Sequence, residues 1–94
     1  MLATKYSQYL QKVVRQYFPK DQNQIFIFGS ALRKKHFRDI DIAIRGPVDY
    51  TKLSQLRSEL TNSTFPYLID LITFDQTEQA FQNYVLKKET KKWL

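Results

Sequence analysis

The chain has 94 residues, 43% of them hydrophobic and 26% charged, a composition typical of a single globular domain, which we expect to span residues 1–94. It contains no cysteine, which excludes disulfides, thiolate metal ligands and thiol nucleophiles. Fifteen Lys and Arg against nine Asp and Glu give a net charge of +6, which favours polyanionic partners such as nucleic acid or nucleotide phosphates. No apolar run is long enough to span a membrane and no signal-peptide pattern is present, so we expect a cytoplasmic protein.

The periodicity of apolar residues predicts alternating helices and strands. Helical spacing is followed by Pro19, a β-rich run ends at a glycine, and a later run alternates strictly between isoleucine and other residues. The expected elements are a helix over 4–18, a strand over 24–29, a strand over 39–45, a helix over 50–61, a strand over 67–74 and a helix after residue 78. This order predicts an α/β or α+β fold, with a small mixed sheet flanked by helices.

Acidic residues are expected to begin two of the helices. Asp49 precedes the helix over 50–61 and is the expected N-cap. Asp75, with Glu78 three residues later, resembles a capping box with Asp in place of Ser or Thr. By its spacing, the helix that follows is expected to bury four side chains, those of Ala80, Phe81, Tyr84 and Val85.

Three aspartates interrupt strands that are otherwise apolar. Asp39 and Asp41 stand one residue apart, so their side chains share one face of a strand, and Asp70 lies alone in the strand over 67–74. Burying a carboxylate costs free energy unless it is paired or binds a cation. Asp39 alone could be a turn residue, but a structural role for all three is disfavoured. If the two strands are neighbours, the carboxylates converge, and oxygen ligands suit Mg²⁺ or Mn²⁺. Two such ions can clamp a phosphoryl group in an in-line displacement.

Gly29 and Ser30 stand where the strand over 24–29 ends. A glycine lets backbone amides approach a phosphate closely, and the serine hydroxyl adds one donor. The pair could also be an ordinary turn, but its place ahead of the two aspartates favours a phosphate. Four basic residues follow, and we expect at least two of them to be merely solvated: Arg33, Lys34, Lys35 and Arg38.

The stretch FGSALRKKHFRDIDIAI resembles the G-S…D-x-D signature of the DNA polymerase β-like nucleotidyltransferase superfamily. The stretch YLIDLITFD resembles the strand that bears the third carboxylate of that superfamily. The likeness extends from about residue 20 to the last residue, and the size and the order of elements resemble the minimal nucleotidyltransferases of bacteria and archaea. The resemblance implies the palm fold of the superfamily.

The resemblance also implies a role for each residue. Asp39 and Asp41 would bind both of two metal ions, while Asp70 would bind the catalytic ion and help to activate an acceptor hydroxyl. Gly29 and Ser30 would hold the β- and γ-phosphates of a nucleoside triphosphate, most simply ATP. The basic residues of the same loop could help to neutralise the triphosphate: Arg33, Lys34, Lys35 and Arg38. A nucleoside monophosphate would then pass to the acceptor, and pyrophosphate would leave.

Minimal members of the superfamily are commonly paired with helical HEPN-type proteins in toxin–antitoxin systems. The resemblance therefore implies a HEPN-type partner, with which this chain forms a hetero-oligomer. In such pairs the nucleotidyltransferase is the antitoxin and can attach AMP to a tyrosine of the toxin, which is a ribonuclease.

Two features depart from the family pattern. Eight residues separate Ser30 from Asp39, fewer than is common, and this segment lacks the additional glycine often seen there. Two other functions stay open: a non-catalytic antitoxin that neutralises its partner by contact, and a small nucleic-acid-binding protein. The nucleic-acid hypothesis ranks last because the aromatic residues lie in apolar runs rather than in exposed strands.

Overall fold

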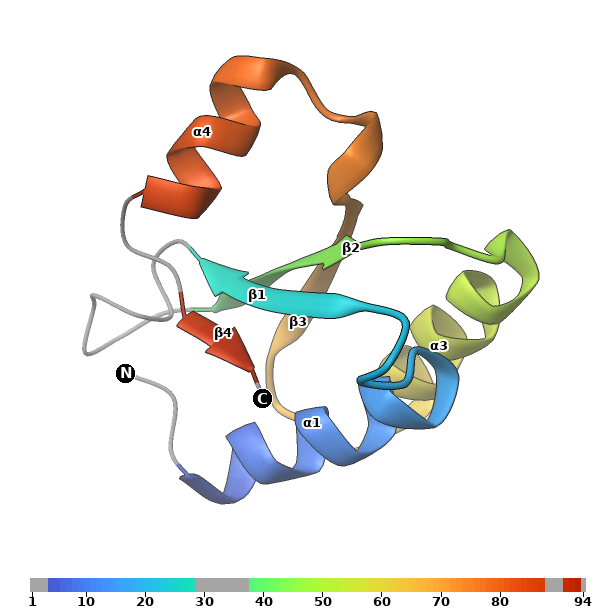
Figure 1. The fold of residues 1–94 in the computed structure, drawn as a ribbon. Helices are drawn as coiled ribbons and strands as arrows, with labels where there is room; N and C mark the ends of the chain where they lie inside the picture. Colours follow the sequence, from blue (N-terminus) through green and yellow to red (C-terminus); the bar gives the residue numbers. More distant parts are fainter. Residues whose placement is uncertain (1–3, 29–37, 88–90, 94) are drawn as a thin grey trace.

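The computed structural model describes residues 4–28, 38–87 and 91–93. Figure 1 shows the elements in chain order: α1 (Thr4–Tyr17), β1 (Gln24–Phe28), β2 (Asp39–Arg45), α3 (Tyr50–Asn62), β3 (Leu68–Thr73), the short 3₁₀ helix η1 (Phe74–Gln76), α4 (Gln79–Lys87) and β4 (Lys91–Trp93). Within the described residues, no helix is both long enough and apolar enough to cross a membrane.

The four strands form one mixed sheet in the order β3-β2-β1-β4. β1 pairs antiparallel with β2 and with β4, whereas β2 and β3 are parallel. A parallel pair needs a crossover connection, and α3 provides it. The expected α+β architecture is therefore confirmed. The edge strand β4 was not predicted, because Lys91–Trp93 is short and mostly charged and becomes a strand by pairing with β1.

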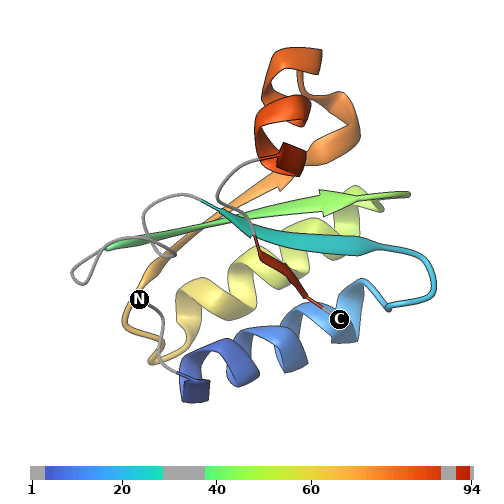
Figure 2. The ribbon, with the colours of Figure 1, turned by 60° about the vertical axis from the view of Figure 1, so that its left-hand side comes forward.

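Helices cover both faces of the sheet, as Figures 1 and 2 show: α1 and α3 lie against one face, and α4 lies against the other. The larger core lies on the face of α1 and α3 and consists of Leu10, Val13, Val14, Phe18, Ile25, Ile27, Ile40, Ile42, Ile44, Leu53, Leu56, Leu60 and Leu71. The smaller core lies under α4 and consists of Phe26, Phe28, Ala43, Phe74 and Val85. The alternation in β2 sends its three isoleucines into the larger core, as predicted.

The expected N-cap of the helix before β3 is confirmed. Asp49 Oδ1 accepts hydrogen bonds from the backbone N of Thr51 at 2.8 Å and of Lys52 at 3.4 Å. These two bonds satisfy backbone N–H groups that have no partner within the first turn of a helix.

The expected capping box at Asp75 is wrong. Asp75 lies in η1, where its Oδ2 accepts a hydrogen bond from the backbone N of Gly46 at 3.1 Å, and α4 begins only at Gln79. The side chain of Gln82 donates to the backbone oxygens of Phe74 (3.1 Å) and Thr77 (3.0 Å), which ties α4 to η1. A contact distant in sequence thus replaces the local cap.

The expected burial of the last helix is only partly confirmed. Val85 is buried and Phe81 is half-buried, but Ala80 and Tyr84 are exposed. The nine-residue helix covers only part of its face of the sheet, so a single narrow stripe of its surface makes contact. Helical spacing predicts the side of the helix but not the width of the surface that receives it.

The strand that carries two of the aspartates depends on its buried face. Ile42 is fully buried in the larger core, so Ile42→Ala is expected to lower the free energy of unfolding by about 2–5 kcal/mol. Chemical denaturation monitored by circular dichroism measures this loss. Leu86→Ala is the control, since Leu86 is 47% exposed on α4 and its truncation is expected to change stability by less than about 0.5 kcal/mol. Equal losses in the two variants would contradict the assignment of the core.

Candidate active site

The parallel pairing of β2 with β3 brings the three aspartates to one face of the sheet. In this register Asp41 is the partner of Asp70, and Asp39 is the partner of Leu68. Residues that pair directly share a face, as do residues two apart on one strand, so all three carboxylates leave the same face. The sequence predicted this convergence on the condition that the two strands are neighbours, and the observed pairing meets that condition.

The carboxylates occupy the half of this face that α4 leaves open. One step further along the strands, Ala43 pairs with Ile72, and at that level Phe74 and Val85 cover the sheet. At the carboxylate level α4 meets the neighbouring strand β1, where Phe28 packs against Phe81, but Asp39 and Asp70 are both exposed. The fold therefore presents a carboxylate surface beside a small hydrophobic core.

The aspartates are less buried than their isoleucine neighbours suggested. Only Asp41 is half-buried, whereas Asp39 and Asp70 are exposed, so the expectation of buried carboxylates is corrected. Ile40 and Ile42 are fully buried, but they point to the opposite face, where α1 and α3 pack. Sequence neighbours in a strand therefore say little about the burial of the residue between them.

Negative charge is concentrated around Asp41. Partial burial raises the pKa of the Asp41 carboxyl above its ordinary value, and the charges of Asp70 and then Asp39 raise it further. A cation at this position would relieve the repulsion among the three groups. The arrangement therefore favours a bound cation over three unneutralised carboxylates.

The donor set fits magnesium better than a metal that needs a closed cage. Among the residues described, no three or more His, Cys, Asp or Glu side chains stand close enough together to hold one ion. Mg²⁺ commonly takes one or two carboxylates and completes its shell with water and substrate phosphates. Open carboxylates that share one face, with Asp41 and Asp70 directly paired, fit that mode of binding.

The other predicted site residues lie mostly outside the described residues. These are Gly29, Ser30, Arg33, Lys34 and Lys35, and their predicted contacts with phosphates stay predictions. Arg38 is described and its side chain is exposed. The backbone oxygen of Arg38 accepts a hydrogen bond from the backbone N of Leu68 at 3.0 Å, which ties the residue before β2 to the first residue of β3.

One residue beside the carboxylates was missed from the sequence. Phe28 is the antiparallel partner of Asp41, so its ring leaves the sheet on the carboxylate face. No role at the site was predicted for Phe28, because its neighbours in the sequence form an ordinary apolar strand. Alternation along 24–29, combined with the register against β2, would have placed it there.

The chain matches a family model described as "Polymerase beta, Nucleotidyltransferase" over residues 8–91. The fold and the carboxylate face thus define a nucleotidyltransferase domain. The chain belongs to this family, and the resemblance noted in the sequence is confirmed. No curated protein matches the chain by sequence.

Solved structures with the same fold come from toxin–antitoxin complexes. A variant of the toxin–antitoxin MntA-HpeT with two aspartates changed to glutamate has a TM-score of 0.70 and 21% identity, and covers 92% of this chain and 70% of that one. A second MntA-HpeT variant, with a tyrosine changed to alanine, has a TM-score of 0.74 and 22% identity, and the match covers 100% of this chain and 73% of that one. A chain in the complex of a tri-AMPylated Shewanella oneidensis HEPN toxin with MNT antitoxin has a TM-score of 0.70 and 24% identity, and the match covers 95% of this chain and 70% of that one.

The ionised carboxylate of Asp41 is expected to lower the stability of the fold, and removal of its charge should raise that stability. The pKa of Asp41 is raised on folding, so the folded state favours the protonated carboxyl, and stability is lost as pH rises from 3.8 through the folded pKa. Asp41→Asn is therefore expected to raise Tm at neutral pH by a few degrees without added metal. Thermal melts from pH 3 to 8 measure how this gain grows with pH.

The control for this prediction is Asp21→Asn, which removes the same charge from an exposed turn before β1, at the other end of the sheet. It is expected to leave Tm nearly unchanged. An Asp41→Asn variant that melts below the wild type at neutral pH would show that the ionised carboxylate is stabilised rather than repelled.

Proposed function

We propose that this chain is a metal-dependent nucleotidyltransferase of the cytoplasm that moves AMP from ATP to a tyrosine of a HEPN-type partner toxin and thereby acts as its antitoxin. The observation that carries the proposal is the register that pairs Asp41 with Asp70 and sets Asp39 on the same open face, in a chain of the nucleotidyltransferase family. The partner and the acceptor rest on the fold shared with MNT antitoxins, one of them in complex with an AMPylated toxin.

The open face suits a protein acceptor. Asp39 and Asp70 are exposed, so a side chain presented by another protein could reach them without displacing any of the described residues. Asp70, on the edge strand β3, would accept the proton of the tyrosine hydroxyl as its oxygen attacks the α-phosphorus of ATP. The bond to the β-phosphate breaks in the same step, and pyrophosphate leaves.

Asp39, Asp41 and Asp70 would supply the carboxylate ligands of two metal ions, with one or two of them on each ion. Mg²⁺, or Mn²⁺ in its place, would supply the positive charge that neutralises the triphosphate and the leaving pyrophosphate. The chain itself contributes mainly position, since it holds the carboxylates on rigid neighbouring strands. Gly29, Ser30, Arg33 and Arg38 would bind the phosphates beside them.

A non-catalytic antitoxin is the second candidate. It is favoured by one observation, that the described carboxylates do not form a closed three-ligand cluster. In that case the chain would neutralise its partner by contact alone. The two candidates differ in whether neutralisation needs the aspartates.

Binding of ATP tests the site itself. Calorimetric titration is expected to show ATP binding with Mg²⁺ present and none with EDTA, because the phosphates need the cation to approach the carboxylates. Asp41→Asn is expected to abolish this binding, whereas Asp21→Asn is expected to retain it. ATP binding that survives both EDTA and Asp41→Asn would place the nucleotide elsewhere on the chain.

Transfer of AMP tests the activity. The chain is incubated with ATP labelled at the α-phosphate and with the protein encoded by the neighbouring gene, and label on a tyrosine of that protein is followed by mass spectrometry. Asp41→Asn is expected to lower the rate by roughly 10²-fold or more, since one electrostatic group at the reacting phosphate is lost.

Growth rescue in cells separates the two candidates. If Asp39→Asn combined with Asp41→Asn still protects cells that produce the partner toxin, the non-catalytic antitoxin replaces the enzyme as the function.

A further inference from the structure

Two aromatic rings of α4 continue the row of rings that begins beside Asp41. The rings of Phe28 and Phe81 meet edge to face, with centroids 5.5 Å apart and an interplanar angle of 78°. The rings of Phe81 and Tyr84 lie with centroids 6.4 Å apart at 41°. The three side chains therefore form one wall, which rises from β1 onto α4, and we call it the α4 wall.

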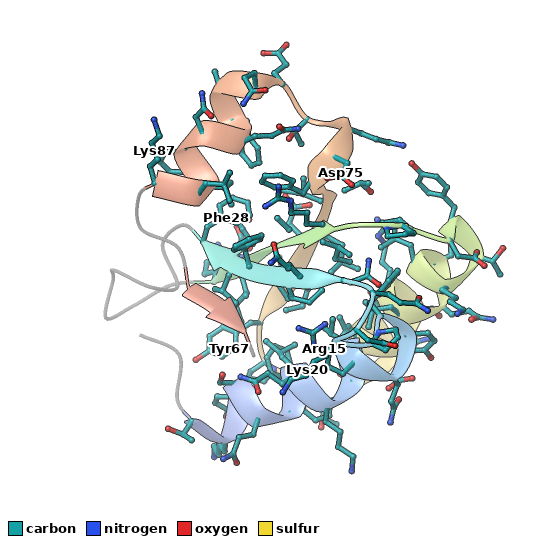
Figure 3. The ribbon with its side chains drawn as sticks, viewed as in Figure 1. Arg15, Lys20, Phe28, Tyr67, Asp75 and Lys87 are labelled. Atoms are coloured by element: carbon teal, nitrogen blue, oxygen red, sulfur yellow. The ribbon has the colours of Figure 1, made fainter. Side chains whose placement is uncertain are left out.

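The α4 wall stands next to the carboxylates. Phe28 is the direct partner of Asp41, and neighbouring strands lie about 4.8 Å apart. Figure 3 shows Phe28 between the sheet and α4, toward the end of the helix that carries Lys87. The wall therefore begins one strand away from the place where the α-phosphate would be held.

Core packing accounts for only part of the α4 wall. Val85 is fully buried and anchors the helix in the smaller core, and Phe28 completes that core from below. Phe81 is only half-buried, and Tyr84 keeps 39% of its surface exposed. An exposed ring beside a half-buried one leaves aromatic surface of α4 free next to the smaller core.

A second aromatic cluster lies away from the carboxylates. Tyr6, Tyr9, Phe65 and Tyr67 pack edge to face or stacked at centroid distances of 5.5–5.6 Å. Tyr9, Phe65 and Tyr67 pack against the larger core, on the face of the sheet opposite to the carboxylates. Only the α4 wall adjoins the carboxylates on their own face, as far as the described residues go.

We propose that Phe81 and Tyr84 form the stacking surface for the base of the nucleoside triphosphate, and that they select purines over pyrimidines. The inference rests on the proposed function and names the part of the substrate that the carboxylates cannot recognise. A ribose separates the base from the α-phosphate, which matches a base site set beside the carboxylates rather than on them. Stacking is sequence-tolerant, but its strength grows with the size of the base, so a purine gains more from the same ring.

The test compares nucleotides and a baseless phosphate by calorimetry with Mg²⁺ present. The wild type is expected to bind ATP and GTP more tightly than CTP and UTP. Tyr84→Ala is expected to weaken ATP binding roughly tenfold and to remove the preference for purines. Inorganic tripolyphosphate, which has no base, is expected to bind wild type and variant equally.

Two further variants test whether the loss of affinity comes from the loss of a ring at this site. Phe81→Leu keeps an apolar side chain against Phe28 but removes the ring, so it is expected to reproduce the loss of ATP affinity without loss of the fold. Tyr50→Ala is the matched control, because Tyr50 is 53% exposed at the start of α3, which follows the other end of β2. It is expected to bind ATP as the wild type does.

The outcomes separate the two proposals. Unchanged ATP affinity in Tyr84→Ala and Phe81→Leu, with binding that still needs Mg²⁺ and Asp41, would overturn the stacking surface and leave the nucleotidyltransferase standing. Equal losses for ATP and tripolyphosphate would also overturn it, because the rings would then act on the phosphate site. Absence of any Mg²⁺-dependent binding of ATP or tripolyphosphate by the wild type would overturn the proposed function and this inference together.

Discussion

The parallel pairing of β2 with β3 is the constraint on which the rest of the structure depends. It sets Asp41 against Asp70 on neighbouring strands, where partial burial and then the charges of Asp70 and Asp39 raise the pKa of Asp41. The pairing is held by the opposite face of the same strands, where Ile40, Ile42 and Leu71 are buried under α1 and α3. Hydrophobic burial on one face thus offsets electrostatic repulsion on the other.

The division of the sheet into two unequal faces explains why the site is open. One face carries the larger core and is covered by two helices, whereas α4 covers only part of the other. The bond from Gly46 to Asp75 ties η1 to the end of β2, and the two bonds from Gln82 tie α4 to η1. Asp39 and Asp70 stay exposed beside the smaller core.

The charge of the chain fits this arrangement. The chain has a net charge of +6, whereas the three carboxylates on this face are negative. A polyanion is attracted by the whole molecule but repelled by the carboxylates, and a cation between the two sets of oxygens would relieve that repulsion. Arg38, exposed directly before β2, adds positive charge next to Asp39 in the chain.

The local features of the fold could be predicted from the sequence. Strict alternation over 39–45 placed Asp39 and Asp41 on one face and the isoleucines on the other, and Asp49 was correctly expected to cap its helix. These predictions hold because the period of a strand and the cap of a helix depend on residues within a few positions of one another.

Only the tertiary structure decided how those pieces meet. The partner of Asp70, the hydrogen bond of Asp75, the strand β4 and the exposure of Tyr84 all depend on residues far apart in the chain. The aspartates themselves show the limit most clearly, since their isoleucine neighbours suggested burial while the uncovered face left two of them exposed. The sequence by itself determined which side chains could form the site, because side-chain direction is a local property. The register of distant strands and the reach of a short helix determined that they do come together, because these follow from packing over the whole domain.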